Sequence, residues 1–174
     1  MELKRFICNF NKYEKEPAFP KGIIKIKANA FNNDITVELA QFDVSLSIIE
    51  SNAFENCQNL EIFVIGENFP EEIVSHGDST ISSDNKKVLE IQKEAFKNCN
   101  KLHTIILGSA NIVTIEKDAF AGCESLRTVV CRTNDISFTN NPFSDCPNYL
   151  TFVGKKDSNL EKFARENGYR FIDD

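Results

Sequence analysis

The sequence has few of the residues on which most enzyme active sites depend. Its 174 residues include only two histidines, His76 and His103, which restricts conventional acid–base and nucleophilic chemistry. It contains no P-loop, no GxGxxG fingerprint, no HExxH motif and no GxSxG motif. The sequence therefore predicts a protein that is not an enzyme, without catalytic residues, cofactor or metal site.

Basic clusters and long apolar runs are also absent. Lysine and arginine total 20 against 26 aspartate and glutamate residues, and the formal net charge is −6. An acidic surface of this kind repels nucleic acid phosphates and anionic membranes. No apolar stretch is long enough to cross a membrane as a helix. We therefore expect no nucleic acid partner and no membrane insertion.

The amino-terminal segment lacks the uninterrupted apolar stretch and the small-residue cleavage site of a secretory signal. As given, the chain is expected to be soluble and leaderless. This favours the cytoplasm, whereas a cell-surface or secreted location is expected if a leader has been removed.

The cysteines do not have the spacing of a zinc site or the density of a small disulfide-rich domain. None of the six stands in a CxxC motif, and the chain is much longer than the secreted domains that disulfides hold together. Their positions have another explanation, which is an internal repeat. The six are Cys8, Cys57, Cys99, Cys123, Cys131 and Cys146.

The repeat follows the template Ile-x-x-x-Ala-Phe-x-x-Cys-x-x-Leu. Residues 49–60, 91–102 and 115–126 match it at every defined position. Residues 138–149 and 26–37 match it with substitutions, which gives five copies in order. The repeated phenylalanines are Phe31, Phe54, Phe96, Phe120 and Phe143.

The period of the repeat identifies its class. Successive phenylalanines stand 23, 42, 24 and 23 residues apart, so the second gap equals one period plus an insertion of 19 residues. The insertion lies at about residues 66–88, which are polar and rich in turn-forming residues. A period of 23 residues falls in the range of leucine-rich repeats and is too short for ankyrin or tetratricopeptide units.

The second half of each copy has apolar residues at every second position, which predicts a strand, whereas the Ala-Phe-x-x-Cys half predicts a turn or short helix. Such a unit buries its apolar face only by stacking on its neighbours. The predicted fold is an α/β repeat solenoid, a right-handed leucine-rich-repeat superhelix. A parallel concave β-sheet lies on one side, short helices or turns lie on the convex side, and a cap helix ends the chain.

We predict a single domain with three parts. Residues 1–22 form an amino-terminal cap, residues 23–156 hold the five repeats with their insertion, and residues 157–174 form a carboxyl-terminal cap. The last part begins with a capping box of Ser158 and Glu161 and is expected to be a short amphipathic helix that stops at Gly168. A final edge strand is expected to follow the helix.

The four cysteines at the template position are expected to form one column inside the solenoid. A small, soft side chain suits such a column, and burial raises the pKa of a thiol and makes it unreactive. We therefore interpret Cys57, Cys99, Cys123 and Cys146 as reduced structural thiols.

These features together resemble the BspA-like family, which is leucine-rich repeat type 5. The similarity covers about residues 22–172 and includes the closing segment at residues 163–171. It implies a non-enzymatic adhesion or protein-interaction role, often at the surface of host-associated bacteria or parasitic protists, and carries no catalytic residues or defined ligand site. This sequence departs from the pattern at Asp34, Pro142 and Tyr149 and in its insertion.

Side chains between the inward positions of the predicted strands are expected to point outward in three columns. The central column is mostly apolar, and an exposed apolar stripe often marks an interaction surface. The alternative is that β-branched residues simply suit a strand. The predicted partner-binding residues are Ile62, Val64, Thr104, Ile106, Thr128, Val130, Arg132, Thr151 and Val153.

Two other groupings have weaker support. Cys99 and His103 are four residues apart, as in a thiol–imidazole pair on a helix, but the template assigns the cysteine to the interior. The insertion carries clustered acidic residues without the spacing of a calcium loop, which favours a solvated acidic loop. Its residues of this kind are Glu67, Glu71, Glu72, Asp78 and Asp84, with His76 among them.

The sequence leaves two hypotheses for function. The first is a module that binds a protein partner, of unknown identity, through the concave sheet. The second is a structural or self-assembling unit without a dedicated ligand, whose open edges or apolar stripe mediate association. A monomer or weak self-association is expected.

Overall fold

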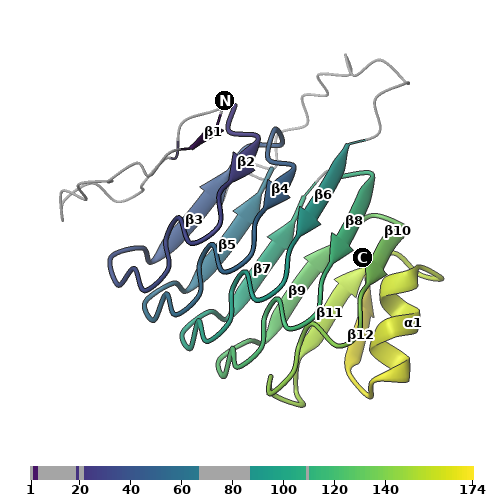
Figure 1. Cartoon of the computed structure of the whole chain (residues 1–174). Helices are drawn as coiled ribbons and strands as arrows, with labels where there is room; N and C mark the ends of the chain where they lie inside the picture. The colour runs from purple at the N-terminus through teal and green to yellow at the C-terminus, as the bar shows by residue number, and fades with distance from the viewer. Residues whose placement is uncertain (1, 4–18, 20–21, 67–86, 109) are drawn as a thin grey trace, which may run out of the picture.

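The computed structural model describes residues 2–3, 19, 22–66, 87–108 and 110–174. In these residues the chain winds into a solenoid with two parallel β-sheets, and a short helix follows near the carboxyl end (Figure 1). The repeat solenoid predicted from the sequence is therefore confirmed.

The two sheets lie on opposite sides of a shared core. Each has six strands in the described residues, and consecutive neighbours in each sheet pair in parallel. We call them sheet A and sheet B. Sheet A runs in the order β1 (Glu2–Leu3), β2 (Lys25–Ile26), β4 (Ile48–Ile49), β6 (Val88–Ile91), β8 (Ile112–Ile115) and β10 (Asp135–Phe138). Sheet B runs in the order β3 (Leu39–Phe42), β5 (Ile62–Ile65), β7 (Thr104–Leu107), β9 (Thr128–Cys131), β11 (Thr151–Gly154) and β12 (Arg170–Asp173).

Sheet B is the sheet predicted from the alternating half of the repeat, and sheet A was not predicted. The first isoleucine of each template copy ends a strand of sheet A, as Ile49 and Ile91 do. The Ala-Phe-x-x-Cys part then forms turns, and none of the described copies has a helix there. The side opposite sheet B is thus built from a second sheet joined to it by turns.

The repeated phenylalanines form a continuous stack through the core. Ring centroids of Phe54 and Phe96 are 5.0 Å apart with an angle of 6° between the ring planes, and Phe96 and Phe120 are also 5.0 Å apart. These separations are close to the distance between neighbouring strands. Offset-stacked rings of this kind are favourable beyond the apolar area they bury. The same residue therefore recurs because each copy packs on its own counterpart.

The turns stack through backbone hydrogen bonds as well. The amide of Phe54 donates to the carbonyl of Ala95 at 2.7 Å, and the amide of Phe96 donates to Ala119 at 2.7 Å. The amide of Asn56 donates to the carbonyl of Lys97 at 2.8 Å. The turn column is thus held together residue by residue, in the same way as the sheets.

The carboxyl-terminal cap contains the predicted helix, α1 (Asn159–Glu166). Ser158 is its N-cap and accepts a hydrogen bond from the amide of Glu161 at 3.3 Å. The Glu161 carboxylate accepts from the amide of Asp157 at 2.7 Å, one residue before the position that a regular capping box uses. Leu160 and Ala164 are buried against the end of the core, and β12 follows as the predicted final strand.

Part of the amino-terminal cap and most of the insertion lie outside the described residues. Phe19 is described and is buried, with its ring stacked on Phe42 at 4.4 Å between centroids. The acidic residues of the insertion and His76 belong to residues 67–86, outside the described part. In the described residues, no helix is both long and apolar enough to span a membrane.

Candidate functional site

The strand register brings the predicted partner-binding residues into rows across sheet B. Ile62 is paired with Thr104, Thr104 with Thr128, and Thr128 with Thr151. The intervening positions, such as Val129 and Phe152, belong to the hydrophobic core. Because side chains alternate along a strand, the threonine row lies on the outer face of sheet B.

The central row lies beside it on the same face. Val64 is paired with Ile106, Ile106 with Val130, and Val130 with Val153. This row continues to Ile172 in β12, whose side chain is 40% exposed. The face therefore carries a polar row and an apolar row in register over several strands.

The expected exposure of the whole apolar row is wrong for two of its members. Val64 is 0% exposed and Ile106 is 8% exposed, although neither belongs to the central hydrophobic core. Val130 and Val153 are half-buried. The part of the apolar row that a partner can reach is thus concentrated on β9, β11 and β12. Strand alternation predicts direction, but it carries no information on what covers a side chain from outside.

Arg132 follows β9 and is exposed. Its guanidinium forms an ion pair with the carboxylate of Asp174, just after β12. This residue therefore links the ends of two strands of sheet B. It lies beside the threonine and valine rows rather than within either of them.

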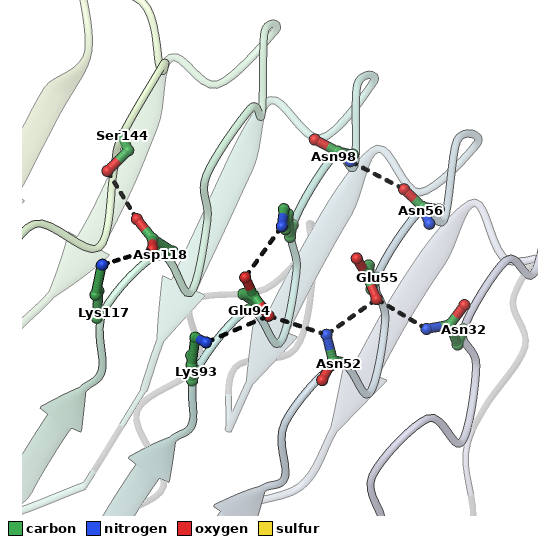
Figure 2. Close-up of polar contacts among 11 residues, drawn as sticks. Asn32, Asn52, Glu55, Asn56, Lys93, Glu94, Asn98, Lys117, Asp118 and Ser144 are labelled. Atoms are coloured by element: carbon green, nitrogen blue, oxygen red, sulfur yellow. Dashed lines mark hydrogen bonds and ion pairs between the residues drawn. The ribbon is translucent and has the colours of Figure 1, made fainter.

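A second polar surface, which the sequence reading missed, lies on the turns. Asparagines of successive turns form a ladder. The Asn98 side-chain amide donates to Asn56 at 3.1 Å (Figure 2), and the Asn56 side-chain amide donates to Asn33 at 3.2 Å. All three have positive φ angles, near 60°. Glycine and asparagine adopt this conformation more readily than most residues, and the next turn has Gly122, with φ of 70°.

Charged groups extend this turn surface (Figure 2). The Glu55 carboxylate accepts from the amide nitrogens of Asn52 at 2.9 Å and Asn32 at 3.0 Å. The Lys97 ammonium lies 3.0 Å from the Glu94 carboxylate, which lowers the pKa of Glu94 and raises that of Lys97. The Asn32–Glu55 bond joins neighbouring turns, whereas the Asn52–Glu55 and Lys97–Glu94 contacts lie within one turn. These groups are therefore bonded to one another on the turn surface.

The asparagine ladder corresponds to a pattern that is visible in the sequence. Asparagine, aspartate or glycine stands just before the template cysteine in every copy, or before Asp34 in the first copy. The five residues all have positive φ. They are Asn33, Asn56, Asn98, Gly122 and Asp145.

The template cysteines are free thiols, as predicted. Each donates a hydrogen bond to the carbonyl of the phenylalanine in the preceding turn, as Cys99 does to Phe54 at 3.1 Å and Cys123 does to Phe96 at 3.2 Å. Burial raises the pKa of Cys99 well above its usual value and raises the pKa of Cys146 to about 12. These two thiols are therefore protonated at neutral pH and serve as small hydrogen-bond donors.

The structure does not assemble a Cys99–His103 pair. The thiol is buried and donates to a backbone carbonyl, whereas Nδ1 of the His103 ring lies 2.8 Å from the Thr104 hydroxyl. Among the described residues, no group of three or more histidine, cysteine, aspartate or glutamate side chains is placed to hold a metal ion.

Comparisons with known proteins agree with this architecture. The family model described as "BspA type Leucine rich repeat region" matches in six copies, over residues 8–85 and 74–164. The crystal structure of the pneumococcal vaccine antigen PcpA contains a similar chain, with a TM-score of 0.52 and 14% sequence identity. The alignment covers 89% of this chain and 40% of that one, so this chain spans less than half of the antigen's length. At that identity the similarity shows the fold alone. No curated protein matches the sequence significantly.

Proposed function

Because the chain belongs to the BspA-type leucine-rich repeat family, we propose that it is a protein-interaction module that binds a protein partner on the outer face of sheet B. Solenoids present extended binding surfaces of this kind because each repeat adds one strand to a regular sheet. The proposal concerns binding and includes no chemical step.

The observation that carries the proposal is the pair of rows on β7, β9 and β11. Thr104, Thr128 and Thr151 lie in register and are all partly exposed. Val130 and Val153 lie beside them, half-buried and paired with each other. A hydroxyl both donates and accepts hydrogen bonds, and a valine methyl supplies apolar contact. The arrangement offers both kinds of contact on a rigid sheet.

The proposed contact is centred on the later strands of sheet B. Val64 and Ile106 are buried, so they support the sheet more than they reach a partner. Ile62 and Arg132 lie at the border of the surface, and Arg132 is already held by Asp174. A few residues at the centre of an interface usually carry most of its binding energy. We assign that role to Val130 and Val153.

The setting that we propose is adhesion at a cell surface. The structurally similar pneumococcal protein is described as a vaccine antigen. The support for this setting is analogy between folds.

The test compares two lysine variants of the protein. Val130→Lys combined with Val153→Lys places two charges in the proposed contact, and Thr114→Lys places one on the outer face of sheet A. Thr114 is a matched control because it is also a partly exposed strand residue. Each protein is immobilised, a cross-linker is added, and partners captured from the native host extract are quantified by mass spectrometry.

We expect the double variant to lose at least about tenfold of the captured partner, since a central contact often contributes more than about 1.4 kcal/mol. The Thr114→Lys protein is expected to retain it. Thermal melting of both variants checks that each is folded. Equal capture by the double variant and the parent protein would contradict the proposal, as would equal loss from the Thr114→Lys control.

A further inference from the structure

Among the described residues, the last strand of sheet B, β12, has a neighbouring strand on one side only (Figure 1). The amide of Arg170 donates to the carbonyl of Leu150 at 3.3 Å, and the amide of Asp174 donates to Gly154 at 3.0 Å. Alternate residues of a parallel strand face the same neighbour. The backbone N–H and C=O groups of Phe171 and Asp173 therefore point away from β11, toward the open edge.

The side chains of this edge are accessible. Arg170 and Asp173 are exposed, and Ile172 is 40% exposed, which makes it one of the most exposed large apolar side chains of the described residues. The helix α1 packs against β10, β11 and β12. The strand contains no proline that would prevent further pairing.

The opposite end of the solenoid differs. The ring of Phe19 stacks on Phe42 of β3 at 4.4 Å between centroids and lies edge-on to Phe31 at 5.7 Å. Phe42 is 4% exposed. The aromatic side chains of the first described turn are therefore covered, whereas the side chains of β12 are accessible. An association that uses one end only joins two copies and then stops.

The sequence of β12 is complementary to itself in the antiparallel direction. If Phe171 of one copy pairs with Asp173 of a second copy, each such pair exchanges both of its N–H···O bonds. In this register Ile172 lies directly opposite Ile172 of the second copy. Arg170 then lies opposite the Asp174 carboxylate of the second copy, and this occurs twice because of the two-fold symmetry. Opposite charges and apolar pairs placed across strands in this way both stabilise a sheet.

We propose that the chain forms a two-fold symmetric dimer by antiparallel pairing of β12 with β12 of a second copy. The occupant of the open edge is thus this same chain. Pairing joins the two B sheets into one and extends the apolar row from Val130 and Val153 through Ile172 into the second copy. The hydrogen bonds of the dimer form at the strand edge, so the dimer does not require a bound partner, although Ile172 belongs to both the edge and the apolar row of the partner face.

The first test measures mass by sedimentation equilibrium over a range of protein concentrations. Ile172→Lys places two like charges directly across the two-fold axis and is expected to weaken dimerisation at least tenfold. Thr128→Lys carries the same added charge on the same face, two strands away from the edge, and is expected to leave dimerisation unchanged. Thr128→Lys changes the proposed partner face but not the strand edge. A loss of partner capture can therefore be distinguished from a loss of the dimer.

The second test is covalent and does not depend on tight association. In an antiparallel pair, directly opposite residues that do not exchange hydrogen bonds, as Ile172 and Ile172 of the second copy are in this register, have Cα atoms about 4.5 Å apart. That distance is within the range of a disulfide. Mild oxidation is expected to convert the Ile172→Cys protein to a covalent dimer. The Thr128→Cys protein and the parent, whose own cysteines give the background, are expected to remain monomers under denaturing electrophoresis.

The two tests decide the proposal together. A monomeric mass at every concentration, combined with no covalent dimer from Ile172→Cys above the background, would overturn it. Dimerisation that Ile172→Lys leaves intact would also overturn it, since the contact would then lie elsewhere.

Discussion

Interior turns of the solenoid and its last turn differ in the acceptor of one hydrogen bond, which the backbone amide of the repeated phenylalanine donates. In an interior turn, the amide of the repeated phenylalanine donates to the next turn, as Phe96 does to Ala119 at 2.7 Å. Phe143 belongs to the last turn and has no following turn. Its amide donates instead to the side chain of Asn141 at 3.0 Å. A side chain therefore replaces the missing neighbour.

The substitutions in this last copy follow from the same difference. Pro142 replaces the template alanine, and its carbonyl still accepts from the amide of Phe120 at 2.8 Å. In interior turns the alanine amide donates within its own turn, as Ala95 does to Gln92, but proline has no such donor. Interior copies also have a positive φ angle directly before the template alanine, as at Glu94, and in the last copy this angle lies one position earlier, at Asn140.

The first copy shows the corresponding change at the other end. Asp34 stands where later copies have cysteine, and its carboxylate accepts from the amide and the hydroxyl of Thr36 at 2.7 and 2.6 Å. The cysteines donate instead to a preceding turn. The departures from the template thus lie in the first and last of the five template copies.

The strongest way to break the interior is to interrupt the phenylalanine stack. Phe96→Ala is expected to lower the free energy of unfolding by about 3–5 kcal/mol, because it removes a fully buried ring that contacts rings on both sides. Phe163→Ala in the cap is expected to cost about half as much, since this ring is only half-buried. Urea denaturation of both variants measures the difference. Equal losses of unfolding free energy in the two variants would show that a ring of the interior stack stabilises the protein no more than the ring in the cap.

The template cysteines give a second comparison, between a buried and a half-buried thiol, with an expected loss of stability of intermediate size. Cys99 is 0% exposed and Cys146 is half-buried, although each donates to a phenylalanine carbonyl. Cys99→Ala is expected to cost about 1–2 kcal/mol because it leaves a cavity and an unpaired carbonyl. Cys146→Ala is expected to cost less than about 1 kcal/mol, since water reaches its site. The reverse order in guanidinium denaturation would contradict this interpretation.

The smallest effect concerns the cap of the last turn. Asn141→Ala removes the acceptor of the Phe143 amide and is expected to destabilise the protein by about 1 kcal/mol. Asn134→Ala is the matched control, since it changes an exposed asparagine that lies just before the last template copy and is expected to stay within about 0.5 kcal/mol of the parent. Hydrogen exchange of the Phe143 amide should also become faster in Asn141→Ala only. Unchanged exchange there would mean that the amide has another acceptor.

Much of the fold could be predicted from the sequence because its information is local and repeated. The period, the phenylalanine and cysteine columns and the Ser158 cap each depend on spacing along the chain. Sheet A was missed because its earliest repeat strands are very short, as Lys25–Ile26 and Ile48–Ile49 are. Two residues are too few for an alternating pattern to distinguish a strand from a turn.

The candidate surface was predicted only in part. The rows that contain Thr128 and Val130 could be drawn from strand alternation alone. The burial of Val64 and Ile106 could not, because strand alternation gives the direction of a side chain and not its exposure. The final edge strand was predicted, and the strand order confirms that β12, with Ile172, ends sheet B among the described residues.

The sequence by itself determined the repeating unit, since a buried ring and a buried thiol are needed at the same point of every turn. Only the tertiary structure decided which faces and edges of the solenoid remain accessible. The physical reason is that interior positions are specified by identical neighbours one period away, whereas exposure depends on segments distant in the chain.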